Sequence, residues 1–211
     1  MNTQTHLLLS AAVFAKPNRP LRNVAALAGG LVPDMSLFIM YGWGKATSVS
    51  ERVIFRDWYF DPVWQSAGAV TNSWPIYLGA SLAAVSMGGK VRLLPTPMDS
   101  PDEQDRRRYL WSALLIFALA AALHVATDFP VHVNDGRPAF WPFSSWIFSS
   151  PISYWDSRYY GSIVGLFEMV LAFGLCIILW RRFSGWPARA AILVALATYA
   201  AVAHHWSEVF G

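Results

Sequence analysis

The chain has 211 residues, of which 55% are hydrophobic and 14% are charged, and its formal net charge is +3. Soluble domains carry about 25% charged residues, so a soluble fold of this size would expose too much apolar surface. The hydrophobicity excludes a disordered chain, and the single cysteine, Cys176, excludes a disulfide scaffold. Basic residues gather beside apolar runs, which argues against a nucleic-acid binder. The composition predicts one all-helical integral-membrane bundle over residues 1–211.

The N-terminal segment 4–15 is apolar but too short to cross a bilayer, which needs about 20 helical residues. It is expected to form a half-helix that enters the bundle part-way and ends at Lys16-Pro17. The next apolar stretch, 23–43, is long enough to span. Gly29-Gly30 and Pro33-Asp34 interrupt it, so a kinked or broken span is expected.

Four further stretches are candidate spans. Residues 68–88 begin with a first turn weakened by Asn72, Ser73 and Pro75. The other three stretches are long and strongly apolar: 109–129, 159–180 and 187–206. Together with 23–43, they predict five spans in addition to the half-helix.

The basic residues are unevenly shared among the connections. Eleven of the sixteen lie in 16–22, 89–108 and 181–189, and the other five lie in 44–67 and 130–158. By the positive-inside rule, the first three connections are expected in the cytoplasm. The other two loops are rich in aromatic residues and proline, which is typical of an interfacial aromatic belt or of a lid that contacts substrate.

Several ionisable side chains lie inside apolar stretches, where each costs about 3 kcal/mol or more at a helix centre. His124 and Asp128 are four residues apart and share a helix face, so they suit one metal ion or a mutual hydrogen bond. His6 and Asp34 flank the basic turn 16–22 and lie about 15–18 Å from it along antiparallel helices. His124 lies about 24 Å from its own basic connection. The depth of His124 therefore differs from that of His6 and Asp34 by about 6–9 Å. Helix tilt and the break at Pro33 can absorb this difference in depth, so a shared site is expected.

Three more residues are candidates for the same site. His132 continues the four-residue step from Asp128 and is predicted as a metal ligand at the mouth of the site. Glu168 is predicted as a fourth or fifth metal ligand or as the general base, and its alternative is a partner for a tyrosine or tryptophan donor. Asp135 is predicted as a general base, and its alternative is a simple turn. Two histidines with two carboxylates suit a divalent ion such as Zn²⁺ or Mn²⁺.

The chain resembles the YdjM-like family of inner-membrane proteins, which are described as metal-dependent hydrolases. Three motifs carry the resemblance: Thr5-His6, Gly30-Leu31-Val32-Pro33-Asp34, and His124 to Asp128 followed by Gly136 and Phe140-Trp141-Pro142-Phe143. The resemblance implies an inner-membrane location and a metal site formed by His6, Asp34, His124 and Asp128.

One segment departs from the family pattern. Members usually carry Arg-Gly-x-Thr-His-Ser between the second and third motifs, and the nearest counterpart here is Thr71-Asn72-Ser73. Asn72 then serves as a weaker ligand or an orienting group, or this branch has lost catalysis.

Three functions follow as hypotheses. The first is a hydrolase that acts on an ester or phosphoester, such as a lipid-like substrate, at the non-cytoplasmic interface of the bilayer. The second is a non-catalytic subunit of a larger membrane protein complex, in which the buried polar residues are structural. The third is a small transporter with ion sites at Asp34 and Asp128, against which the absence of any sequence repeat counts.

Overall fold

The helices enclose a site near one end of the bundle. The computed structural model describes residues 1–88 and 103–210, and within these ranges the fold is all-helical, as predicted. In chain order the elements are α1 (Thr3–Phe14), α2 (Pro20–Leu31), the 3₁₀ turn η1 (Val32–Asp34), α3 (Met35–Ala46), α4 (Glu51–Arg56), η2 (Trp58–Phe60), α5 (Pro62–Thr71), α6 (Trp74–Met87), α7 (Glu103–Asp128), η3 (Phe129–Val131), η4 (Ser157–Tyr159), α8 (Gly161–Arg182) and α9 (Trp186–Phe210).

Three segments of the described residues are long and apolar enough to cross a membrane: Pro20–Ala46, Arg106–Val131 and Gly161–Arg182. These segments indicate a membrane protein. The predicted count of five spans is wrong by this measure. The expected interruption of the first span is confirmed, because the 3₁₀ turn at Val32–Asp34 separates α2 from α3.

One of the two missing spans has an identifiable cause. Stretch 68–88 is divided because α5 ends at Thr71 and the Ser73 hydroxyl accepts the Ile76 amide, which caps a new helix. The resulting α6 has 14 residues, or about 21 Å of helix, which is shorter than a bilayer core of about 30 Å. Stretch 187–206 lies in helix α9, which has 25 residues, and Trp186–Val202 is its described apolar part.

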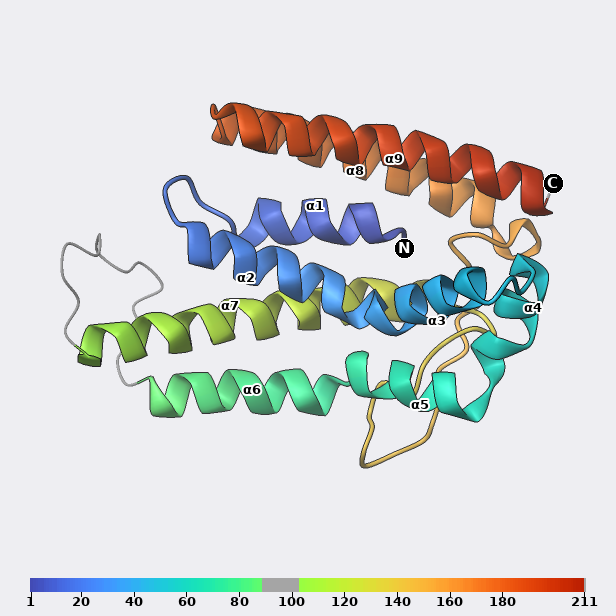
Figure 1. Cartoon of the computed structure of the whole chain (residues 1–211), viewed down its shortest axis with the longest axis horizontal. Coiled ribbons are helices and arrows are strands. Elements are labelled where there is room, and N and C mark those ends of the chain that lie inside the picture. Colours follow the sequence, from blue (N-terminus) through green and yellow to red (C-terminus); the bar gives the residue numbers. More distant parts are fainter. Residues whose placement is uncertain (89–102, 211) are drawn as a thin grey trace.

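Helix α7 is the centre of the bundle and packs against α2 and α6 (Figure 1). The α2–α7 contact depends on Gly29, where a Cβ atom would lie 2.3 Å from the Phe117 carbonyl oxygen. Ala26, Ala120 and Ala121 are also fully buried. Small side chains therefore let the two backbones approach closely.

The predicted N-terminal half-helix is present as α1, which lies between α2 and α8 (Figure 1). Leu8 of α1 packs in one apolar cluster with Leu175 and Leu179 of α8 and Ile192 of α9. Arg182 donates to the carbonyls of Ala12 and Ala15, which closes the C-terminal end of α1. At the other end of α1, Thr5 and His6 are buried in the interior of the bundle.

The basic connections 16–22 and 181–189 lie at the same end of the bundle as the end of α6 and the start of α7 (Figure 1). This arrangement agrees with the predicted grouping of basic loops. In the third connection, 89–108, residues 89–102 lie outside the described residues.

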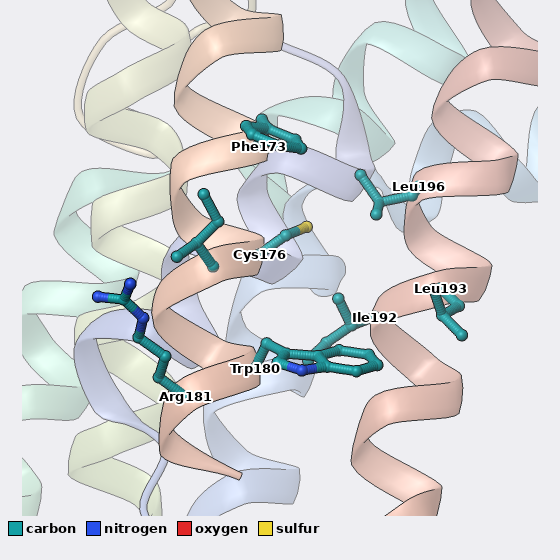
Figure 2. A pocket seen from close by; sticks show the side chains of 8 residues that line it. Phe173, Cys176, Trp180, Arg181, Ile192, Leu193 and Leu196 are labelled. Carbon is teal, nitrogen blue, oxygen red and sulfur yellow. The ribbon is translucent and has the colours of Figure 1, made fainter. Parts of the chain in front are cut away.

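The outer face of α8 is strongly apolar. Phe167, Val170 and Phe173 are 72%, 63% and 60% exposed, as expected of side chains that face lipid. Figure 2 shows an open apolar groove between α8 and α9, lined by residues that include Cys176 and Trp180. This groove shares no residue with the polar site described next.

Candidate metal centre

The first turns of α1 and the last turns of α7 bring His6, His124 and Asp128 together. One ligand atom from each residue lies within 4.8 Å of the others, so the group could hold a metal ion. His6 Nε2 is 3.0 Å from Asp128 Oδ1, and His124 Nε2 is 3.5 Å from Asp128 Oδ2. Both histidines are 1% exposed. His6 from the start of the chain and Asp128 from its middle are therefore close enough to contact one ion.

His124 directs its Nε2 toward this group. Its Nδ1–H donates to the Gly30 carbonyl oxygen at 2.8 Å, because a carbonyl only accepts. Nε2 is a buried atom with no hydrogen-bond partner among the described residues, and in the neutral ring it carries a lone pair. Asp34 Oδ1 and Asp128 Oδ2 each lie 3.5 Å from this nitrogen. Carboxylates and an imidazole nitrogen that face one another in this way can share a cation, and the N-terminal ammonium of Met1 already contacts Asp128 Oδ1.

The two imidazoles are held parallel. The rings of His6 and His124 stack with centroids 3.5 Å apart and an interplanar angle of 13°. His6 Nδ1 lies 3.3 Å from the Thr127 hydroxyl, which itself donates to the Leu123 carbonyl. The hydroxyl can accept the Nδ1–H, and His6 Nε2 is then free to coordinate. Hydrogen bonds of this kind fix the tautomer and orientation of metal-binding histidines.

Asp34 is fixed from two sides in the 3₁₀ turn after α2. Its Oδ2 accepts from the Thr3 hydroxyl at 2.5 Å, while Oδ1 faces His124. The carbonyl of the preceding Pro33 accepts from Thr71 Oγ1 and Asn72 Nδ2, each at 3.0 Å. Of the two roles considered for Asn72 in a working site, these contacts support the orienting group.

His132 and Asp135 continue the site beyond the end of α7. His132 Nε2 is 3.4 Å from Asp128 Oδ2, and its Nδ1 is 3.1 Å from Asp135 Oδ2. Burial alone would lower the pKa of His132, but the Asp128 and Asp135 carboxylates outweigh it and raise the pKa to about 9. Burial would raise the pKa of Asp135, but its hydrogen bond and ion pair with His132 lower it below the ordinary value.

Glu168 is buried in α8, and its observed contacts are with the start of α1. Its Oε1 accepts from the Asn2 amide at 2.6 Å and from the Thr5 hydroxyl at 2.8 Å. Because Thr5 and the ligand candidate His6 are neighbours in α1, Glu168 helps to fix the height of His6 in the bundle. Its role as a general base stays a prediction, as does that of Asp135.

The structure adds groups that the sequence reasoning missed. Thr3 lies one helical turn before His6, and this spacing is the only sequence signal that places it on the same face. The Tyr59 hydroxyl donates to the Asp135 carbonyl at 2.6 Å, and Trp155 Nε1 donates to Asp135 Oδ2 at 2.8 Å. These two aromatic residues come from the long loops and anchor the segment that carries His132.

The predicted metal ligands thus meet around Asp128, with His6 and His124 closest together and with Asp34 and His132 on its flanks. Comparisons of the chain with protein-family models, with curated proteins and with solved structures found no match.

Proposed function

We propose that this protein is a membrane-embedded, metal-dependent hydrolase related to the YdjM-like family. The observation that carries the proposal is the buried Nε2 of His124, which lies 3.5 Å from each of two carboxylates and has no hydrogen-bond partner among the described residues. Imidazole nitrogens and carboxylate oxygens are the donors that Zn²⁺ and Mn²⁺ accept. In this proposal, His6, His124 and Asp128 hold the ion, and Asp34, which lies outside this mutual group, supports it from 3.5 Å beside His124 Nε2.

A bound divalent ion would supply an acidified water molecule as the nucleophile. Asp135 is the general base that we favour over Glu168. It is joined to Asp128 through His132, whereas Oε1 of Glu168 accepts two hydrogen bonds from the start of α1. The imidazolium of His132 lies between the two aspartates, where it can release its Nδ1 proton toward Asp135 while its Nε2 side takes up the proton from the water molecule.

The location of the site supports an amphiphilic substrate. Asp128 is the last residue of α7, and this end of α7 points away from the basic connections, with α3, α8 and α9 extending beyond it (Figure 1). If those connections face the cytoplasm, as the positive-inside rule predicts, the site lies near the other interface of the inner membrane. A lipid-like ester or phosphoester would reach it there directly from the bilayer.

The test is metal content together with hydrolysis. The protein is purified in mild detergent, loaded with Zn²⁺ or Mn²⁺, and compared with His124→Ala, Asp34→Ala and the exposed control Asp57→Asn. We expect stoichiometric metal in the parent and the control, and its loss in the two site variants. Chromogenic carboxylic esters and phosphoesters should be cleaved only by the metal-bound forms. A parent protein that holds no metal after loading would refute the proposal.

Asn72 favours a second candidate function, a non-catalytic membrane subunit. It replaces the histidine of the family pattern, and its amide donates to the Pro33 and Gly68 carbonyls. For a subunit, the same experiment should give a metal-free protein that folds stably and co-purifies with a partner complex.

A further inference from the structure

We infer that Asp128 bridges two cation subsites, one formed with His6 and His124 and the other formed with His132. This inference rests on the proposed metal centre and extends it. It assigns the second subsite to residues that lie outside the mutual His6–His124–Asp128 group.

Distance separates the two subsites. Ligands lie about 2.0–2.2 Å from a zinc ion, so two ligands of one ion are at most ~4.4 Å apart. The triad atoms lie within 4.8 Å of one another, close to this limit. His132 Nε2 approaches Asp128 Oδ2 to 3.4 Å but does not belong to that mutual set. An ion centred between His6 and His124 therefore leaves His132 uncoordinated.

The carboxylate of Asp128 is oriented to serve both sides. Its Oδ1 faces His6 at 3.0 Å and contacts the Met1 ammonium, while its Oδ2 lies between His124 at 3.5 Å and His132 at 3.4 Å. Carboxylates commonly share their two oxygens in this way between paired ions, which lie about 3.5–4 Å apart in two-metal enzymes.

His132 is positioned as a ligand. Its Nδ1 lies 3.1 Å from Asp135 Oδ2, and that oxygen also accepts from Trp155 Nε1 at 2.8 Å. A carboxylate behind the ring orients the other nitrogen toward a metal and increases its basicity. Asp135 is therefore a positioning residue for the second subsite. Two protein ligands leave open positions for water or substrate oxygens, as is usual for Mg²⁺ and Mn²⁺.

Asp34, Asp128 and Asp135 bring three carboxylates to one largely buried cluster, with side chains 16%, 15% and 14% exposed. The Met1 ammonium contacts Asp128 Oδ1, so this ammonium and one divalent ion together balance the charge of the three carboxylates. Two adjacent ions would suit the charged oxygens of a phosphoester better than a neutral carboxylic ester.

The experiment counts ions without reference to activity. The full chain in detergent is titrated with Mn²⁺, bound metal is measured by mass spectrometry, and spin coupling between ions is followed by electron paramagnetic resonance. We expect two ions and a coupled spectrum in the parent and in Asp57→Asn. His132→Ala should bind one ion and give an uncoupled spectrum. Asp135→Asn should keep the tighter ion and weaken the second about 10- to 100-fold.

The outcomes distinguish this inference from the proposed function. A parent that binds neither Mn²⁺ nor Zn²⁺ overturns both, and a parent that binds Zn²⁺ but no Mn²⁺ overturns this inference alone. A parent that saturates at one ion overturns the second subsite and leaves the hydrolase standing, as does a His132→Ala variant that still binds a coupled pair. If His132→Ala fails to fold, Asp135→Asn decides the matter, and an unchanged affinity for the second ion overturns the inference.

Discussion

Replacing Gly29 with alanine should damage the metal centre from a distance. The added Cβ would lie 2.3 Å from the Phe117 carbonyl oxygen and 2.7 Å from the Ala120 Cβ. Both atoms belong to α7 and are fixed to its backbone, so α2 and α7 must separate by roughly 1 Å to restore ordinary van der Waals contact. The next residue in α2, Gly30, provides the carbonyl that accepts His124 Nδ1–H at 2.8 Å. A separation of this size would lengthen that hydrogen bond to about 3.8 Å and break it.

The magnitude follows from these contacts. Overpacking costs about 1–3 kcal/mol, and the lost hydrogen bond adds about 1 kcal/mol. The better helix propensity of alanine returns up to about 1 kcal/mol. We expect a net loss of about 1–3 kcal/mol in unfolding free energy. Metal affinity should fall about 10- to 100-fold because His124 loses the bond that orients it.

Matched controls are available in other helices. A Cβ at Gly42 in α3 or at Gly79 in α6 would meet nothing within 4 Å among the described residues. Alanine at either position should leave metal affinity unchanged and stability equal or higher. The assays are thermal unfolding in detergent and titration with Zn²⁺. If Gly29→Ala matches these controls in both assays, the close α2–α7 contact does not support the site.

Three further perturbations give distinct outcomes. Glu168→Ala should lower the unfolding free energy by about 1–3 kcal/mol because the Asn2 amide and Thr5 hydroxyl lose their acceptor. Glu168→Gln, which keeps an acceptor oxygen, should lose less, and equal losses in thermal unfolding would contradict this role. Asn72→Ala should weaken Zn²⁺ binding about 10-fold by releasing the Pro33 carbonyl next to Asp34, and an unchanged titration would remove Asn72 from the site's support. Chelation of a parent loaded at 100 times its Kd should remove about 2.7 kcal/mol of stability. The same treatment should leave His124→Ala unaffected, and a similar shift in that variant would mean that the metal binds elsewhere.

The sequence predicted that four ionisable residues would meet, namely His6, Asp34, His124 and Asp128. The reason is that an isolated charge inside an apolar helix is costly, and one shared site lowers this cost for all four. Depth arithmetic left a mismatch of about 6–9 Å between His6 and His124. Figure 1 shows its resolution, since α7 begins beyond the starting end of α2. The extra residues of α7 offset the greater distance of His124 from its basic connection.

Other features could not be predicted from local sequence. The division of stretch 68–88 into α5 and α6 depends on Ser73, whose hydroxyl caps α6 and also donates to the Trp141 carbonyl. The engagement of Glu168 with Thr5 joins residues 163 positions apart. Contacts of this kind are set by how the helices pack, and no periodicity along the chain reveals them.

The most direct test of the central claim is X-ray absorption at the zinc edge of the loaded protein. It reports how many imidazole nitrogens surround the ion. Imidazole scattering should be strong in the parent and should decrease in both His6→Ala and His124→Ala, because α1 and α7 each supply one ring to the same ion. If zinc binds and its spectrum is the same in His6→Ala as in the parent, α1 contributes no ligand and the shared site is refuted.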